Sequence, residues 1–232
     1  MQSYSQFGED ALLWQHFNGK LNGFFVEVGA NHPTKFSQTW LLEQQGWNGI
    51  LVEPLPSKCE LLRSMRPRSI VAQAAMGAPE QRGRAKFSVA EEDDMLSGLE
   101  LDAHVSVGSF EDVEVRTLDD VLTDAGHPTI DLLSIDVEGL ELNVLRGFSI
   151  ERYKPSILLI EDHLQQLTVH RHVVSRGYRL VKRTGCNNWY VPNDAPFSLT
   201  SKLQKIRLWK QIHLDTPIRC VRFYFKKRRW RK

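Results

Sequence analysis

The stretch Phe24-Phe-Val-Glu-Val-Gly-Ala-Asn31 decides the fold of this 232-residue chain. Its aromatic and β-branched residues are typical of a buried strand, which Gly29 ends. Asn31 is suited to cap a following helix, and Pro33 fits the first turn of that helix. The order strand, glycine turn and helix N-terminus brings backbone N–H groups to one point, which favours a nucleotide-like ligand.

A second strand with an acidic end, Ile50-Leu-Val-Glu-Pro54, follows after one predicted helix. Its Glu53 lies 24 residues beyond Gly29. In a parallel sheet the two strand ends are neighbours, so the Glu53 carboxylate can accept hydrogen bonds from both hydroxyls of a ribose.

The turn differs from the dinucleotide fingerprint, because Ala30 and His32 stand where further glycines would admit a pyrophosphate. Glu27 lies inside the apolar strand, and a buried carboxylate is costly without a partner such as an ammonium group. These features favour an adenosine ligand with a cationic amino-acid end. S-adenosylmethionine has that shape and charge.

Strands and helices alternate along the first 197 residues, which predicts a doubly wound, mostly parallel sheet with helices on both faces. Ligands bind such sheets beyond the carboxyl ends of the strands. The expected strands are 24–28, 49–53, 69–75, 130–136 and 156–160, with a closing hairpin of 178–183 and 189–191. Expected helices include 36–45, 56–65, 138–146 and 164–176, and a polar loop spans 91–109 between two antiparallel segments, 85–90 and 113–116. Residues 1–197 form the predicted domain, and residues 198–232 form a basic amphipathic tail.

Four motifs in order resemble the FkbM family of S-adenosylmethionine-dependent methyltransferases. They are Ser5-Gln-Phe-Gly-Glu-Asp10, Val26-Glu-Val-Gly-Ala-Asn31, Leu51-Val-Glu-Pro54 and Ile135-Asp-Val-Glu-Gly-Leu-Glu141. The resemblance runs from about Tyr4 to Val191. It implies the Rossmann-like class I methyltransferase fold, with seven strands, and O-methylation, commonly of a sugar hydroxyl.

The resemblance also implies roles for single residues. Glu27 and Gly29 would contact the methionine part of the cofactor, Glu53 the ribose, and residues near Ala74 the adenine. The N-terminal motif, including Gln6 and Glu9, would form a flap over the cofactor. Asn31 and Asp136 complete the expected cofactor contacts.

Three carboxylates, Asp136, Glu161 and Asp162, follow two strands that we expect to be adjacent. Carboxylates that repel one another favour a bound cation, and an open, oxygen-rich set suits Mg²⁺. Such an ion would orient two sugar oxygens and lower the pKa of the one that is methylated. Alternatively, Asp136 caps the following helix, and the other two carboxylates bind water or substrate hydroxyls.

A sugar hydroxyl must lose its proton when it is methylated, so a base has to lie within hydrogen-bond reach. His163 is the first candidate because it follows a strand end directly and its ordinary pKa is near neutrality. Glu138 and His32 are the alternatives, and Asp136 is a further expected catalytic residue.

The net charge of +2 hides a strong asymmetry. Residues 202–232 carry twelve Lys/Arg and one acid, whereas the preceding residues carry a net charge of −9. Three scattered cysteines without CxxC spacing argue against a disulfide framework or zinc site and favour a reduced compartment. Neither a signal peptide nor a membrane-spanning run is evident, so we expect a cytoplasmic protein.

The tail alternates basic residues with aromatic ones, including Phe223, Tyr224, Phe225 and Trp230. This composition favours peripheral binding to the anionic inner face of a membrane. A solvated tail and a nucleic-acid-binding arm are the alternatives.

Together these patterns predict a membrane-peripheral O-methyltransferase that acts on a surface polysaccharide, O-antigen or lipid-linked glycan. A nicotinamide-dependent sugar oxidoreductase would also use Glu53, but the glycine triplet is missing. A nucleic-acid-binding or RNA-methylating protein is disfavoured because the body of the chain is acidic.

Overall fold

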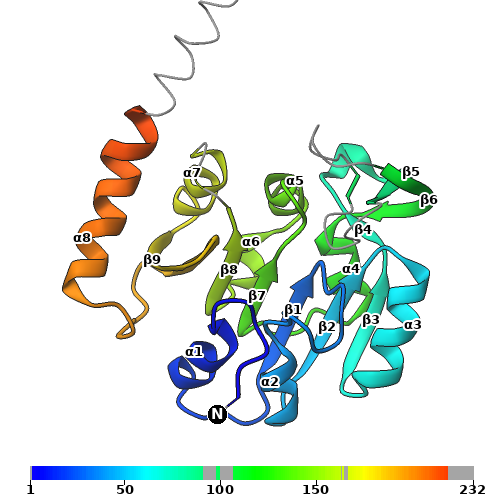
Figure 1. Ribbon diagram of the computed structural model, residues 1–232, viewed down its shortest axis with the longest axis horizontal. Helices are drawn as coiled ribbons and strands as arrows, with labels where there is room; N and C mark the ends of the chain where they lie inside the picture. Colours follow the sequence, from blue (N-terminus) through cyan, green and yellow to red (C-terminus); the bar gives the residue numbers. More distant parts are fainter. Residues whose placement is uncertain (1, 91–97, 100–106, 163, 165–166, 219–232) are drawn as a thin grey trace, which may run out of the picture.

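The computed structural model describes residues 2–90, 98–99, 107–162, 164 and 167–218. A seven-stranded sheet forms its centre, in the order β3-β2-β1-β7-β8-β10-β9 (Figure 1). The strands are β1 (Phe24–Val28), β2 (Asn48–Glu53), β3 (Ser69–Gln73), β7 (Leu132–Ile135), β8 (Ile157–Glu161), β9 (Tyr178–Thr184) and β10 (Asn187–Pro192). The first five strands in this order are parallel, and β10 is antiparallel to both β8 and β9. The predicted fold class is therefore confirmed.

Helices cover both faces of the sheet, because successive strand residues point to opposite faces. On one face Val26 and Val28 pack against α4 (Leu118–Asp124), α5 (Glu141–Arg146), α6 (Ile150–Tyr153) and α7 (Thr168–Val174). On the other face Phe25 packs with α1 (Glu9–His16), α2 (Trp40–Gln44) and α3 (Pro56–Met65). Glu27 belongs to the second face, so its carboxylate enters the layer that holds α1 and α2.

A second, smaller sheet continues from the carboxyl end of β3, in the order β4-β6-β5. It consists of β4 (Ala75–Met76), β5 (Gly83–Ala90) and β6 (Val107–Arg116), with the short helix η1 (Pro79–Gln81) between β4 and β5. Two expectations are corrected here: the strand predicted at 69–75 divides after Gln73, and β6 begins at Val107 instead of Val113. Most of the polar loop predicted between β5 and β6 lies outside the described residues.

Three predicted helices begin later than expected. The helix expected from Phe36 begins at Trp40, the one expected from Glu138 begins at Glu141, and the one expected from Leu164 begins at Thr168. In each case the residue expected to begin the helix has a left-handed backbone, with φ of 60° at Phe36, 53° at Glu138 and 52° at Leu164. An L-residue in that conformation cannot continue a right-handed helix.

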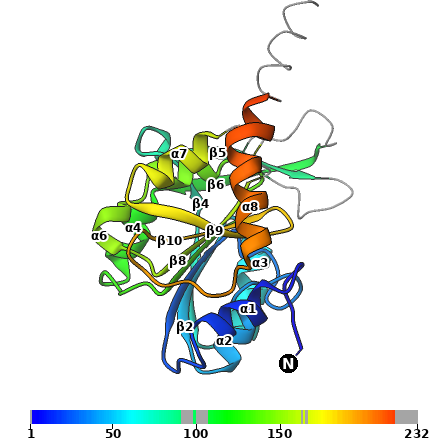
Figure 2. The same cartoon turned by 90° about the vertical axis from the view of Figure 1, so that its left-hand side faces the viewer.

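The chain then forms helix α8 (Lys202–Lys210), which passes into the π-helical turn η3 (Gln211–Asp215). Ser201 and Gln204 form a capping box at the start of α8. Figure 2 shows α8 beside the outer strand β9. None of the helices in the described part of the chain is long and apolar enough to cross a membrane.

Candidate active site

A pocket opens at the carboxyl ends of β1, β2 and β7, where the parallel strands point (Figure 1). The predicted site residues that line it are Glu27, Gly29, Asn31, Glu53, Ala74, Asp136 and Glu138. Apolar side chains, among them Val52, Leu55 and Met76, form much of the remaining wall. These seven residues therefore share one pocket, while the contact of each residue with a cofactor stays a prediction.

Gly29 is required by the geometry of the turn between β1 and the pocket. Its φ is +85°, and a Cβ at this position would lie 1.8 Å from the carbonyl oxygen of Asp136. The N–H group of Gly29 donates to the carbonyl of Val52 at 3.0 Å. Glycine thus lets the ends of β1 and β7 approach closely beside the pocket.

The Glu53 carboxylate is held in place by backbone donors. One oxygen accepts from the N–H of Asn31 and the other from the N–H of Leu55, each at 3.0 Å. Glu53 is 4% exposed, so the side chain forms part of the pocket floor rather than an open surface. Its position at the end of β2 is the one that the predicted ribose contact requires.

Asn31 does not cap a helix, which corrects the first expectation from the sequence. Residues 32–39 contain no helix, and the Asn31 backbone is left-handed with a φ of 45°. The side chain of Asn31 instead accepts a hydrogen bond from the ammonium group of Lys58. Lys58 also lines the pocket, so this contact joins α3 to the turn after β1.

Glu27 finds its partners within the protein, in the loop that precedes α2. The carboxylate accepts from the Gln38 N–H at 3.0 Å, the Thr39 hydroxyl at 2.5 Å and the Ser37 hydroxyl at 3.3 Å. Burial raises the pKa of Glu27, and the nearby Arg66 guanidinium opposes this rise. The burial of Glu27 therefore does not by itself require a ligand ammonium group.

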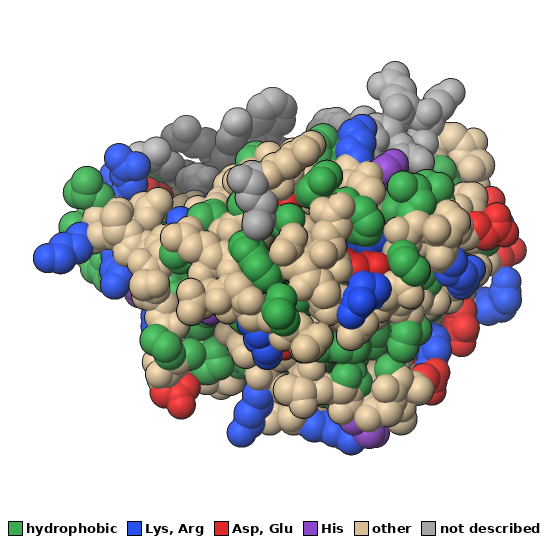
Figure 3. All heavy atoms as spheres, turned by 90° about the horizontal axis from the view of Figure 1, so that it is seen from below, with side chains coloured by type: hydrophobic (Ala, Val, Ile, Leu, Met, Phe, Trp, Pro, Cys, Tyr) green, Lys and Arg blue, Asp and Glu red, His purple; other side chains and the backbone are tan. Residues whose placement is uncertain are grey.

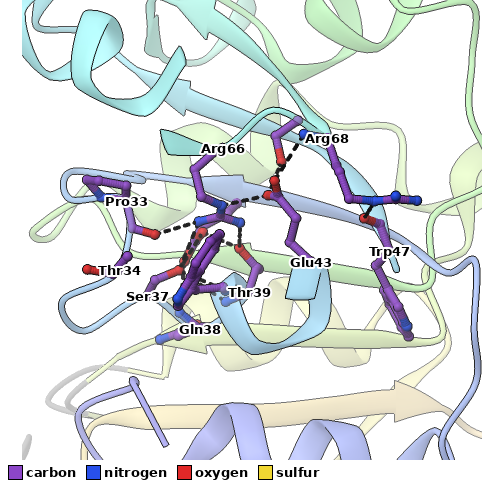
Figure 4. A network of polar contacts seen from close by, with 12 residues as sticks. Pro33, Thr34, Ser37, Gln38, Thr39, Glu43, Trp47, Arg66 and Arg68 are labelled. Carbon is purple, nitrogen blue, oxygen red and sulfur yellow. Dashed lines mark hydrogen bonds and ion pairs between the residues drawn. The ribbon is translucent and has the colours of Figure 1, made fainter. Parts of the chain in front are cut away.

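Arg66 supports the same loop through a network of polar contacts, and no pattern in the sequence indicated this role (Figure 4). Its side chain has no exposed surface and forms an ion pair with Glu43 at 2.6 Å. The guanidinium also donates to the Pro33 carbonyl at 3.0 Å and the Thr39 hydroxyl at 2.9 Å. It lies over the rings of Phe25 and Trp40. Since residues 35–38 line the pocket, this buried cation supports one of its walls.

Three acids, Asp136, Glu138 and Glu161, meet at the ends of β7 and β8. One oxygen of each carboxylate lies within 4.8 Å of the others. Burial and the neighbouring Glu161 carboxylate raise the pKa of Asp136 well above its usual range. Burial also raises the pKa of Glu161. Groups at this spacing can share a proton, and they can also hold a divalent cation.

Asp162 is not part of this group, which corrects the predicted metal set of Asp136, Glu161 and Asp162. One carboxylate oxygen of Asp162 accepts from the Leu164 N–H at 2.7 Å, and neighbouring strand residues point to opposite faces. Glu138, which was predicted only as a catalytic residue, takes its place. His163, the first candidate base, lies outside the described residues and stays a prediction. The alternative base, His32, accepts from the N–H groups of Thr34 and Lys35 at 3.1 and 3.0 Å.

The N-terminal motif, residues 5–10, is bound to the hairpin of β9 and β10 through Glu9. Glu9 is fully buried and accepts from the side chains of Thr184 at 2.8 Å and Asn187 at 2.9 Å. Glu9 thus anchors this segment. Neither Gln6 nor Glu9 is among the described residues that line the pocket, and their expected contact with the cofactor stays a prediction. The segment still reaches the site, because Ser5 pairs with Phe36, a pocket residue.

Comparisons with known proteins match residues 27–180 to the methyltransferase FkbM domain. A search of curated proteins found no similar sequence. Among solved structures, a methyltransferase FkbM from Methylobacillus flagellatus KT is 17% identical with a TM-score of 0.49, over 73% of this chain and 43% of that one. A precorrin-6y C5,15-methyltransferase from Geobacter metallireducens GS-15 is 11% identical with a TM-score of 0.46, over 82% and 90% of the two chains. This chain thus spans less than half the length of the Methylobacillus protein.

Proposed function

Because this chain belongs to the FkbM methyltransferase family, we propose that it transfers the methyl group of S-adenosylmethionine to a sugar hydroxyl. The acceptor would be a surface polysaccharide, an O-antigen or a lipid-linked glycan. The observation that carries this proposal is the group of Asp136, Glu138 and Glu161 beside a pocket that is also lined by Gly29 and Glu53.

The pocket complements each part of S-adenosylmethionine. The Glu53 carboxylate is placed to accept hydrogen bonds from the ribose hydroxyls, and Val52, Leu55 and Met76 offer an apolar surface to the adenine. The acids Glu27 and Asp136 line the pocket as well. Their negative charge suits the ammonium and sulfonium groups of the methionine part.

The pair of Asp136 and Glu161 is our candidate for the base. A carboxylate with a raised pKa is a stronger proton acceptor than an ordinary one, and it accepts the proton more readily as the new bond forms. The hydroxyl oxygen would attack the methyl carbon in line with the sulfur. The carbon–sulfur bond breaks, the sulfur leaves as a neutral thioether, and the hydroxyl proton passes to the carboxylate. Positioning of donor and acceptor supplies much of the rate.

The same acids define where Mg²⁺ would bind if the reaction uses a metal. In that case the ion would lower the pKa of the acceptor hydroxyl, and the carboxylates would act as ligands instead of as a base. Assays in excess chelator separate the two mechanisms. Full turnover in chelator favours proton transfer to the carboxylate pair, whereas a loss that Mg²⁺ restores favours the metal.

The proposal is tested with a labelled methyl donor and a set of glycan fractions. We expect label in a saccharide fraction with the natural chain and at least about a hundredfold less with Asp136→Asn or Glu161→Gln, since general base catalysis contributes about 10²–10⁴-fold. Glu60→Gln, which changes an exposed acid on α3, is the matched control and should keep full activity.

Calorimetry provides the binding control. S-adenosylmethionine should bind to the natural chain and to Glu161→Gln, and more weakly to Asp136→Asn because Asp136 lines the pocket, whereas NAD should not bind. Binding of NAD alone would overturn the proposal in favour of the oxidoreductase. Label that enters RNA but no saccharide would overturn the choice of acceptor.

A further inference from the structure

The exposed side of α8 and η3 carries large apolar side chains in a helical stripe. Leu203, Ile206 and Trp209 are 68%, 63% and 58% exposed, and they lie three residues apart along α8. Leu214 and Ile218 continue the exposed apolar surface beyond the helix. Single exposed apolar residues are ordinary, but a row of them on one helix face indicates an interaction surface.

The C-terminal part of the same helical segment is attached to the body of the protein. Ile212 is buried with Leu164 and Leu167, and the Thr216 hydroxyl donates to the Leu164 carbonyl at 3.2 Å. Trp209 stands at the edge of the groove between α8 and β9, beside Ile212, with more than half of its surface exposed. Leu203 and Ile206 face solvent.

Cationic side chains flank the apolar stripe. Lys202, Arg207 and Lys210 are all exposed on α8, and Asp215 is the sole acid from Lys202 to Ile218. Figure 3 shows Lys and Arg side chains standing out beside hydrophobic ones at its left-hand end, the side on which α8 lies in Figure 1. In sequence, residues 219–232 add eight Lys/Arg and no acid.

We infer that this face of α8 docks on the surface of an anionic lipid bilayer, with Leu203, Ile206 and Trp209 inserted among the headgroups and acyl chains. The charge argues for this occupant, because the residues around the apolar stripe are cationic while the rest of the chain carries a net negative charge. A bilayer with anionic lipids therefore attracts this part of the protein. A helix with apolar and basic residues on its free face binds at such an interface without crossing the membrane. Nucleic acid would be recognised by the charges but gives the aliphatic side chains of Leu203 and Ile206 no partner.

Binding to vesicles tests the inference with the full chain and does not depend on methyl transfer. The chain should sediment with vesicles that contain phosphatidylglycerol and much less with vesicles of phosphatidylcholine alone. Salt should weaken this binding, because ions screen exposed charges. Failure of this test would leave the proposed methyl transfer intact, and the reverse also holds.

Two triple variants separate the contributions of charge and apolar surface. Replacing Lys202, Arg207 and Lys210 with Gln should weaken binding roughly fivefold per charge, since each contributes about 1 kcal/mol near the surface. Replacing Leu203, Ile206 and Trp209 with Ser should weaken it at least about tenfold through the lost apolar burial. The matched control is Leu21→Ser with Ile70→Ser, which removes exposed apolar residues elsewhere and should bind like the natural chain.

The outcome that overturns the inference is equal sedimentation of the natural chain and the apolar triple variant. Equal binding to neutral and anionic vesicles would overturn it as well. A short RNA duplex is the competitor: if it binds the stripe more tightly than the vesicles and displaces them, the surface serves nucleic acid instead. Thermal melting confirms that every variant keeps the fold, which is expected because all six replaced residues on α8 are exposed.

Discussion

Replacing Arg66 with methionine should destabilise the protein strongly, although residue 66 lies away from any expected chemistry. The change keeps an elongated side chain that can still pack against Phe25 and Trp40. It removes the ion pair to Glu43 and the hydrogen bonds to the Pro33 carbonyl and the Thr39 hydroxyl. A buried carboxylate then remains without its countercharge.

The size of the effect follows from these contacts. Breaking a buried ion pair by removing one partner costs about 3–5 kcal/mol. The loss of the ion pair itself should cost the lower value of about 3 kcal/mol. Glu43 still accepts hydrogen bonds from the N–H of Arg68 at 3.1 Å and from the hydroxyl of Ser69 at 2.6 Å. The Pro33 carbonyl, left without its guanidinium donor, adds about 1 kcal/mol. The total of about 4 kcal/mol corresponds to a melting temperature roughly 8–16 °C lower for a chain of this size.

The loss should also depend on pH. Burial raises the folded-state pKa of Glu27, and Arg66 holds that pKa down, so Arg66→Met raises it further. A carboxyl with a raised folded pKa costs stability as the pH rises through that pKa, because the folded state then has to give up a proton it binds more tightly. The difference between the natural chain and the variant should therefore be larger at pH 8 than at pH 5.

Urea denaturation at both pH values measures the free energy of unfolding, and calorimetry measures the affinity for S-adenosylmethionine. That affinity should fall together with stability, since the supported loop lines the pocket. The matched control is the double variant Arg66→Met with Glu43→Gln, which removes both charges and should recover much of the loss. An Arg66→Met variant within about 1 kcal/mol of the natural chain, or a double variant no better than the single one, would refute the reasoning.

Three further outcomes are expected from the pocket. Gly29→Ala should lower the unfolding free energy by about 2 kcal/mol or more in urea denaturation, because its Cβ would meet the Asp136 carbonyl in a left-handed turn; a loss under about 0.5 kcal/mol would contradict this. Glu53→Gln should weaken S-adenosylmethionine binding about 10- to 100-fold in calorimetry, since one charge-assisted hydrogen bond is lost. Asp136→Asn should make the protein more stable than the natural chain at alkaline pH, because the raised pKa of this carboxyl means that its ionisation costs folding energy. Parallel pH–stability curves for Asp136→Asn and the natural chain would disprove that assignment.

The parts of the fold that follow from local patterns were predictable. Short local sequences identify the buried strand at Phe24–Val28, the glycine turn that follows it and the acidic end of β2. In a parallel sheet the ends of such strands lie side by side. Thr117 and Asp120, a pairing of residue types typical of a helix start, form a capping box at α4, with hydrogen bonds of 3.0 and 3.2 Å. These elements are decided by neighbours in sequence, so the sequence alone identifies them.

The missed features depend on partners far apart in sequence. The helix expected from Phe36 starts late because Glu27 takes the Gln38 N–H and the Thr39 hydroxyl from eleven and twelve residues away. Arg66 stands at the end of α3, where a basic residue ordinarily faces solvent, and its burial follows only from the position of Glu43. Glu138 rather than Asp162 joins the acidic group because a left-handed turn redirects the chain after β7.

The close approach of Gly29 to the Asp136 carbonyl limits where substitutions could alter the acceptor preference of this protein. The wall that would hold the methyl donor and the strand end that carries the acids touch through backbone, so they form one rigid block without a hinge between them. Shifts in acceptor preference must therefore originate outside that block, in the β5–β6 hairpin and the turn between β9 and β10. Substitutions there would reshape the entrance and leave the proposed donor site and the proposed base where they are.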